Sequence, residues 1–482
     1  MRSLTLLSGL CYAHRKPMLV PDNETKLTYP DAVHLLLSLV DYERMAGLSA
    51  PAPKYDLARM RELADRLGRP QDTAPVLHVA GTKGKGSVAA MASSILRAAG
   101  LTVGLFTSPH LHTFRERVRL DGEPVSEDRF ASAVDRVWPD VQAMAAQGPG
   151  ARPTTFEVLT AMAFHLFRHQ RVGVQVMEVG LGGRLDATNI VDSNVAVITP
   201  VSLDHTAILG DTVAQVAAEK AGIIKTPSPV VVGLQPAEAL AVIERKAAEV
   251  GAPLTVVGRE VTVKPGQHDL SGQAVRITTP QRTYDVRLPL LGAHQAENAA
   301  VAVAAVEAMG LGVAPDAFVE GLRTVRWDGR FQVLRREPYV VVDGAHNPFS
   351  ISRLCEAVRD YIQPARTVVL FGCSADKDLA AMVDELTGTA TTAVVCASRH
   401  PRAASPERVA EAFRSAGIPA EQAPNVAAAL NAAQEHAGPH DLVLVTGSLF
   451  VVAEALESWF SILGEHYPEF DPQAAAIARS TA

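Results

Sequence analysis

The sequence predicts an α/β protein with a helix-covered parallel sheet, a small antiparallel appendage and a second, smaller α/β unit. Three observations predict this class. Short, continuously apolar strands alternate with helical patterns, as in parallel sheets that are buried on both faces. An apolar strand over 76–80 runs straight into a glycine-rich turn that opens a helix. Thr- and Val-rich segments over 261–288 alternate without a helical pattern, which indicates antiparallel strands.

The first unit begins with two expected helices between Tyr29 and Leu67. Their apolar residues fall at helical spacing, and the run 50–53 (Ala-Pro-Ala-Pro) separates them. Beyond the strand over 76–80 we expect a helix to Ala99 and a helix over 156–167. Short apolar runs predict further buried strands at 102–106, 174–179 and 195–199.

A second α/β series follows a helix expected at 295–309. Its predicted strands lie at 339–342, 367–371, 393–396 and 442–446, each followed by a helical pattern. We place the domain boundary near Val325. The predicted organisation is a disordered extension over 1–25, a nucleotide-binding domain over 26–325, a C-terminal domain over 326–470 and a tail over 471–482.

Composition limits the possible function classes. The 482 residues are 48% hydrophobic and 20% charged, which is ordinary for a globular protein. The net charge of -7 argues against general binding to nucleic acid or to an anionic membrane. No apolar run reaches the length of a membrane helix. The four cysteines show no CxxC spacing, so we expect a reducing, cytoplasmic location.

The glycine-rich turn after the first strand has the features of a phosphate-binding loop. Glycines let backbone N–H groups converge on an anion, and the helix N-terminus adds positive charge. Lys85 would reach the outer phosphates and Ser87 would face a magnesium ion. Gly86 separates these two residues, so the general motif is matched only loosely, and a turn with no phosphate role is the alternative. The expected ATP-binding residues are Gly81, Thr82, Lys83, Gly84, Lys85, Gly86 and Ser87.

Polar residues follow three other predicted strands. Ser108 comes after the strand ending at Phe106, Glu178 ends its own strand, and His205 lies shortly after Thr199. Strand ends are where ligands bind in such sheets, and oxygen and imidazole ligands together with nucleotide phosphate would suit Mg²⁺. Taken singly, Ser108 before Pro109 is as well explained as a turn residue, and a lone histidine as a structural one.

Eight segments, in their order and spacing, resemble the folylpolyglutamate synthase/dihydrofolate synthase family of the Mur ligase superfamily. The resemblance covers about residues 29–454, and several motifs, above all EVGLGGRLDATN with DGAHNP, look specific to the folate branch. In one departure, the family commonly has Asn where this chain has Lys83. The segments are HVAGTKGKGS (78–87), TSPHL (107–111), EVGLGGRLDATN (178–189), LDHTAILG (203–210), EKAGIIK (219–225), HQAENAAVA (294–302), DGRFQ (328–332) and DGAHNP (343–348).

The resemblance implies a three-layer ATPase domain of the Mur ligase central type and a Rossmann-like C-terminal domain that closes over the nucleotide. It implies ATP-dependent amide formation through an acyl phosphate, which the amine of glutamate attacks. Ser108 and Glu178 match one magnesium site, and Glu178 with His205 a second. Lys220 matches a lysine that the family carries as a carbamate. That change would turn a cation beside Mg²⁺ into an anionic ligand; the alternative is a solvated helix residue.

The same resemblance assigns further contacts. Asn298 matches an adenine contact, Arg330 a phosphate contact from across the domain interface, and Asp343 a ribose contact. His346 resembles a residue near the γ-phosphate and the incoming glutamate. Glu157 could instead cap its helix. Together the expected catalytic set is Lys85, Lys220, Arg330 and His346, and the pterin-binding segments are Thr154, Thr155, Phe156 and Glu157, with Leu185, Asp186 and Ala187.

We therefore expect an ATP-dependent ligase that joins L-glutamate to a folate and also to dihydropteroate. It would act as a monomer on small molecules, with two Mg²⁺ ions and neither nucleic acid nor membrane as partner. Another Mur-type amide ligase with a different carboxylate acceptor is one alternative. A nucleotide-binding protein without catalysis is the other, although such a protein has no need of a second metal site.

Overall fold

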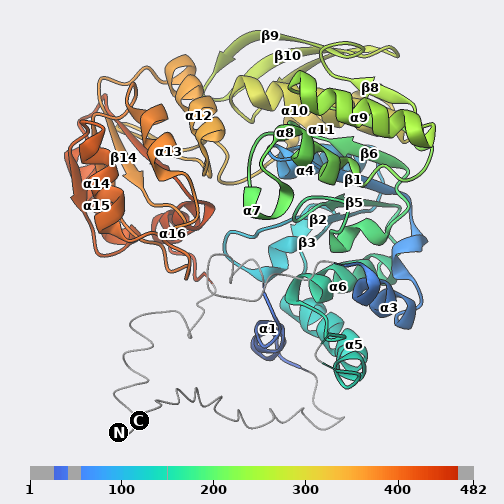
Figure 1. Cartoon of the computed structure of the whole chain (residues 1–482). Helices are drawn as coiled ribbons and strands as arrows, with labels where there is room; N and C mark the ends of the chain where they lie inside the picture. Colours follow the sequence, from blue (N-terminus) through green and yellow to red (C-terminus); the bar gives the residue numbers. More distant parts are fainter. Residues whose placement is uncertain (1–26, 42–55, 149, 465–482) are drawn as a thin grey trace, which may run out of the picture.

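The computed structural model describes residues 27–41, 56–148 and 150–464. The expected extension over 1–25, the tail over 471–482 and the run 50–53 lie outside these ranges. Figure 1 shows two units side by side: a larger one that contains the first sheet and a smaller C-terminal one in orange and red. The chain passes between them after α11 (Pro315–Thr324) and before β12 (Gln332–Arg336), and the boundary predicted near Val325 falls in this connection.

The larger unit is built on an eight-stranded sheet in the order β4-β3-β2-β5-β1-β6-β7-β8. The strands from β2 to β8 in this order pair in parallel, and β3 pairs antiparallel with both of its neighbours, β2 and β4. The strand bounds are β1 Val76–Ala80, β2 Val103–Phe106, β3 Val118–Leu120, β4 Glu123–Pro124, β5 Val174–Glu178, β6 Val195–Ile198, β7 Val230–Val232 and β8 Leu254–Val256.

Side-chain alternation along these strands divides the core into layers. Leu77 and Val79 of β1 pack with one group of helices, whereas Val76 packs with another on the opposite face. Figure 1 shows α4, α10 and α11 above the sheet and α5 and α6 below it. The first group is α4 (Lys85–Ala98), α10 (Ala293–Ala308) and α11; the second is α1 (Tyr29–Leu37), α3 (Ala58–Arg66), α5 (Glu127–Ala145) and α6 (Thr155–His169).

Shorter elements complete the larger unit. Helices α8 (Val213–Ala221) and α9 (Ala237–Val250) pack on β6 and β7, and α7 (Thr206–Leu209) precedes them. A three-stranded antiparallel sheet, β11-β10-β9, lies at the top in Figure 1 and confirms the predicted appendage. Its strands are β9 Thr262–Asp269, β10 Gly272–Thr278 and β11 Thr283–Leu288, and the 3₁₀ turns are η1 Pro70–Thr73, η2 Phe114–Arg117 and η3 Ala187–Ile190.

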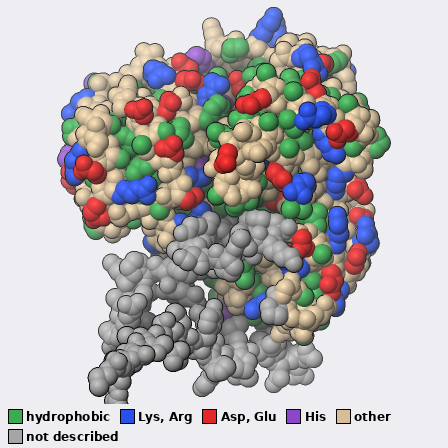
Figure 2. Space-filling model, viewed as in Figure 1, with side chains coloured by type: hydrophobic (Ala, Val, Ile, Leu, Met, Phe, Trp, Pro, Cys, Tyr) green, Lys and Arg blue, Asp and Glu red, His purple; other side chains and the backbone are tan. Residues whose placement is uncertain are grey.

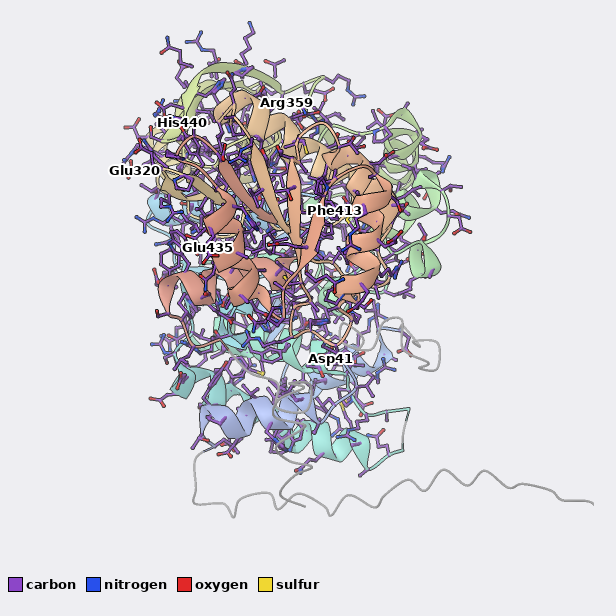
Figure 3. The ribbon with its side chains drawn as sticks, turned by 90° about the vertical axis from the view of Figure 1, so that its left-hand side faces the viewer. Asp41, Glu320, Arg359, Phe413, Glu435 and His440 are labelled. Atoms are coloured by element: carbon purple, nitrogen blue, oxygen red, sulfur yellow. The ribbon has the colours of Figure 1, made fainter. Side chains whose placement is uncertain are left out.

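The C-terminal unit is a six-stranded sheet in the order β12-β13-β17-β14-β15-β16. Figure 3 shows this sheet with helices on both sides, and separate apolar clusters fill its two faces. Its strands are β12, β13 Tyr339–Val342, β14 Thr367–Phe371, β15 Thr392–Val395, β16 Ala420–Gln422 and β17 Leu442–Thr446. Its helices are α12 Pro348–Tyr361, α13 Leu379–Leu386 and α14 Pro406–Ser415 on one face, and α15 Val426–His436 and α16 Leu449–Phe460 on the other.

The predicted α/β class, with its parallel sheets and antiparallel appendage, is confirmed. Acidic and basic side chains are interspersed over the face of both units that Figure 2 shows. In the described ranges, no helix has both the length and the apolar composition needed to span a membrane.

Candidate functional site

The loop between β1 and α4 has the shape of an anion cradle. Gly81 and Gly84 adopt φ values of 143° and 84°, a region that favours glycine. Gly84 is the N-cap of α4 and provides no side-chain cap. The N–H groups of the first helical turn at Lys85, Gly86 and Ser87 have no partners within the helix, and they are therefore available to a phosphate.

Close contacts explain why glycine is required in this loop. A Cβ on Gly81 would lie 1.8 Å from Thr199 Oγ1, and a Cβ on Gly84 would lie 2.4 Å from Asn298 Oδ1. Trp327 lies 3.1 Å from where a Cβ of Gly86 would be. The structure therefore brings Asn298, from α10, directly against the phosphate loop, and its contact with the adenine stays a prediction.

Two predicted loop residues have scaffold partners. The backbone N–H groups of Thr82 and Lys83 both donate to Pro200 O, at 3.0 and 3.2 Å. The Thr82 hydroxyl donates to Ser202 O and accepts from Ser202 N, each at 3.1 Å. Their main-chain N–H groups thus fasten the loop to the segment after β6, and the first turn of α4 is left as the source of phosphate donors.

Glu178 and Ser108 lie together at the carboxyl ends of β5 and β2. Glu178 is 4% exposed, and its Oε2 accepts the Ser108 N–H at 3.1 Å. Burial raises the pKa of Glu178, while the nearby charges of Lys85 and Arg330 oppose that rise. This electrostatic coupling links the carboxylate to the phosphate loop and to Arg330, which comes from the connection to the C-terminal unit.

His205, a predicted magnesium ligand, lies near the surface and has few contacts with the other predicted ligands among those that the structure gives. Its φ is 51°, its side chain is 41% exposed, and its Nε2 lies 3.8 Å from Asp204 Oδ1. Among the described residues, no three His, Cys, Asp or Glu side chains converge as a metal-binding group. Glu178 and Ser108 nevertheless fit Mg²⁺, which takes few protein ligands and completes its shell with phosphate and water.

Lys220 is buried in the last turn of α8, with 4% of its surface exposed. Gly183 lies against it, because a Cβ there would come within 2.9 Å of Lys220 O. Burial, aided by the positive charge of Lys85, lowers the pKa of Lys220 to about 7. The alternative interpretation of a solvated surface lysine is therefore wrong.

Arg330, Asp343 and His346 lie at the edge of the C-terminal unit that faces the loop. Arg330 Nη1 donates to Gly329 O at 3.0 Å. The two oxygens of Asp343 accept the N–H groups of Phe331 and Ala345, both at 2.8 Å. Asp343 thus links the segment 328–332 to the segment 343–348. This is a structural role in addition to the predicted ribose contact.

The predicted pterin segments pack together, but their polar groups have partners within the protein. Thr154 and Glu157 form a capping box at the start of α6. The alternative role of Glu157 as a helix cap is therefore present in the structure. Glu157 also pairs with Arg59, at 3.0 and 3.1 Å. The Thr155 hydroxyl donates to Leu36 O at 3.1 Å, and Phe156 contacts Phe106, with ring centroids 5.8 Å apart.

The second segment lies near the first, since Ala187 belongs to the apolar cluster against which Phe156 packs. Asp186 is buried and caps η3, with Oδ1 accepting the Thr188 N–H at 3.0 Å and Oδ2 accepting the Leu181 N–H at 2.9 Å. Leu185 is partly exposed and Ala187 is buried. The side chains of Phe156 and Leu185 are therefore the members of these segments with surface left for a ligand.

Substitutions at Glu157 separate capping from ligand binding. Glu157→Ala should lower the free energy of unfolding by about 2 kcal/mol, because it removes both the cap of α6 and the ion pair with Arg59. Glu157→Gln keeps an oxygen for the Thr154 N–H and should lose about half as much. Urea unfolding of both variants measures this; wild-type stability in Glu157→Ala would contradict the capping role.

Three residues at the site were not predicted from the sequence: Asp204, Asn347 and Lys377. Asp204 Oδ2 accepts from Lys83 Nζ at 2.9 Å and from Asn347 Nδ2 at 3.2 Å. Its Oδ1 accepts from Lys377 Nζ at 2.9 Å. The available signal was weak: each of the three follows a predicted buried strand, as the chosen site residues do.

Known proteins resemble this chain in both sequence and structure. Residues 79–306 match the Mur ligase middle domain, and residues 329–449 match the Mur ligase glutamate ligase domain. The chain is 34% identical over 407 residues to a Bacillus subtilis dihydrofolate synthase/folylpolyglutamate synthase, covering 83% of this chain and 94% of that protein. It is 38% identical over 441 residues to a Haloferax volcanii protein described as a probable bifunctional folylpolyglutamate synthase/dihydropteroate synthase.

The match covers 90% of this chain but only 51% of the Haloferax protein, so the chain spans about half the length of such relatives. Among solved structures, a Mycobacterium tuberculosis folylpolyglutamate synthase complexed with ADP has a TM-score of 0.83 and 32% identity, covering 89% of this chain and 98% of that one. An Escherichia coli FolC complex with DHPP and ADP has a TM-score of 0.79 and 34% identity, with the same coverage.

Proposed function

The chain belongs to the folylpolyglutamate synthase/dihydrofolate synthase family, and from that premise we propose that it is an ATP-dependent ligase of L-glutamate. The acceptor is the carboxylate of a reduced folate or of dihydropteroate. That carboxylate attacks the γ-phosphorus of ATP and ADP leaves, which gives an acyl phosphate. The amine of glutamate then attacks the acyl carbon, and phosphate leaves as the amide forms.

One observation carries the proposal: Glu178 is buried at the carboxyl end of β5 and accepts the Ser108 N–H at 3.1 Å, close enough to Lys85 and Arg330 for both charges to oppose the rise in its pKa that burial causes. A protein that only binds nucleotide needs the loop, but not a buried carboxylate and a second cation directed at the same place. Lys85, Gly86 and Ser87 would bind the phosphates, and Asn298 would contact the adenine. Arg330 can offer a planar fork of donors to phosphate oxygens.

Mg²⁺ would be held by Glu178 and Ser108 in a first site and by Glu178 and His205 in a second, and it would neutralise phosphate charge. His205 is held next to Asp204 and is partly exposed, so the second site requires closure around the nucleotide. His346 would approach the γ-phosphate and the glutamate. His346 Nδ1 donates to Gly344 O at 2.8 Å, which leaves Nε2 as its acceptor.

The pterin end of the acceptor would lie between the two segments at Phe156 and Leu185, where a ring can stack on Phe156. Both acceptors carry a pterin, so the same surface serves dihydropteroate and a reduced folate. A related folylpolyglutamate synthase was solved with AMPPCP and folate, which supports a folate as the acceptor. We further propose a monomer in the cytoplasm, where Cys355, Cys373 and Cys396, which are free and buried, would stay reduced.

A direct assay tests the proposed function. Purified protein with ATP, Mg²⁺ and L-glutamate is supplied in parallel with dihydropteroate, tetrahydrofolate or a peptidoglycan-type carboxylate acceptor, and ADP release and product mass are measured. We expect glutamate addition to both pterin substrates and none to the third. Extension of tetrahydrofolate alone would reject the bifunctional proposal, and ATP binding without any product would favour the non-catalytic alternative.

The proposed carbamylation of Lys220 can be tested by measuring activity as a function of pH. Only the neutral amine reacts with CO₂, and the lowered pKa of Lys220, about 7, lets that form grow as the pH rises through neutrality. With limiting bicarbonate, activity should therefore rise between pH 6 and pH 8, and saturating bicarbonate should flatten the profile. ¹³C NMR with labelled bicarbonate should show a carbamate signal that is absent from Lys220→Ala.

Lys220→Ala should lose ligation and regain part of it with added formate or acetate, which would replace the missing anion. Lys246→Ala is the matched control, because Lys246 is a surface lysine on α9. Full activity of Lys220→Ala without any added carboxylate would contradict the carbamate.

A further inference from the structure

Asp204 is the centre of a polar cluster that joins the two units. Its side chain is 10% exposed, and it accepts hydrogen bonds from Lys83 Nζ at 2.9 Å, Lys377 Nζ at 2.9 Å and Asn347 Nδ2 at 3.2 Å. Lys83 and Lys377 are 16% and 13% exposed. Both ion pairs are therefore largely removed from water, unlike the surface ion pairs that contribute little.

The partners of Asp204 come from opposite sides of the interface. Lys83 belongs to the phosphate loop of the larger unit, as Asp204 belongs to the segment after β6. Lys377 follows β14 and Asn347 is the N-cap of α12, so both belong to the C-terminal unit. A single carboxylate thus joins two loops of the larger unit to two segments of the C-terminal unit.

Lys83 links Asp204 to His346, a predicted catalytic residue. Its Nζ lies 3.1 Å from His346 Nε2, and the ammonium can only donate. Because Nδ1 of His346 donates to Gly344 O, Nε2 accepts from Lys83, and the imidazole is fixed at both nitrogens. Asp204 therefore orients His346 indirectly, through the ammonium that it holds.

The charges around Asp204 explain why a carboxylate is needed there. Lys83 and Lys377 each approach one oxygen of the same carboxyl group, and Lys85 is close enough to influence the electrostatics of Lys83. Two ammonium groups that bind the same carboxyl group would repel each other if that group carried no negative charge. Asn at position 204 would have the same shape but could accept from only one of them.

On the basis of the proposed function, we propose that Asp204 is a positioning residue for ligation: it holds Lys83 and Lys377 from the two units around the transferred phosphate and fixes His346 through Lys83. ATP binding itself depends on the first turn of α4, which Asp204 does not contact. Loss of Asp204 should therefore reduce turnover without weakening nucleotide binding. Because it leaves two positive charges without their anion, it should even favour nucleotide phosphates.

The test uses Asp204→Asn in the full chain, with three measurements. We expect kcat for glutamate addition to fall about tenfold or more, as misplacement of reacting groups does. ADP should bind as tightly as to the wild type or more tightly by calorimetry, and small-angle scattering should show a more open ADP complex. Asp285→Asn is the control, because it breaks an exposed ion pair within the hairpin of β10 and β11 and should leave all three values unchanged.

A double-mutant cycle provides a second test. If Lys377 acts through Asp204, Asp204→Asn with Lys377→Gln should lose little more turnover than Asp204→Asn alone. Independent, multiplying losses would overturn the positioning role, as would wild-type kcat in Asp204→Asn, or a loss of ADP affinity that matches the loss of kcat. If the wild type adds no glutamate, the proposed function fails instead, while scattering still shows whether Asp204 holds the units together.

Discussion

Replacing Glu178 with alanine is expected to abolish ligation while leaving the fold intact. The carboxylate is buried at the end of β5, where the charges of Lys85 and Arg330 act on it and the proposed magnesium sites share it. Loss of charge stabilisation beside a transferring phosphoryl group should lower kcat about 10³-fold. Burial already disfavours the charged carboxylate, and its backbone partner is Ser108 N, so stability should change little.

Two further variants test whether the charge of Glu178 is responsible for the loss of activity. Glu178→Gln keeps the size of the side chain and an acceptor for Ser108 N but removes the charge, so it should be nearly as inactive as alanine. Glu238→Ala, at an exposed position on α9, should keep full activity. Steady-state ADP release and thermal unfolding are measured for all three, and near-normal turnover in Glu178→Ala would reject the metal assignment.

Arg330→Ala should produce the second largest loss, about 10²-fold in kcat or more. Arg330 comes from the connection between the units, whereas the phosphate cradle belongs to the larger one, so its charge reaches the phosphate when the units are together. The predicted signature is a fall in kcat with ATP affinity changed only slightly. Arg330→Lys keeps the charge without the planar fork and should recover only part of the rate.

Pre-steady-state phosphate release at saturating ATP, together with calorimetry of ADP binding, separates the two effects of Arg330. If Arg330→Ala weakens ATP binding but reaches the wild-type maximal rate, then Arg330 binds nucleotide and takes no part in the transition state.

Most of the fold could be predicted because its signals are local. The strand over 339–342 matches β13 in both of its bounds, since a buried parallel strand is a continuous apolar run. Helix α5, Glu127–Ala145, was missed although Phe130, Val134, Val137 and Val141 repeat at helical spacing and are buried. Polar residues between these positions and the internal Pro139 weaken the local helix signal, which tertiary packing overrides.

In the candidate site, too, the residues that lie close together in the sequence could be predicted, and those from distant segments could not. The phosphate loop is contiguous, so glycine spacing, a preceding strand and a following helix predict it together. The cluster around Asp204 could not be predicted, because Lys83, Asp204, Asn347 and Lys377 lie in four segments that only the packing of two units brings together. Glu157 illustrates the reverse case: its local capping pattern was visible, but its pairing with Arg59, 98 positions away, was not.

The phosphate loop has a thermodynamic consequence for phosphate binding. Its turn is held by Thr199, Asn298 and Pro200 in a conformation that already presents the N–H groups of the first turn of α4. A loop that is ordered before its ligand arrives loses little conformational entropy on binding. We therefore expect the cradle to bind phosphate with little rearrangement of the loop.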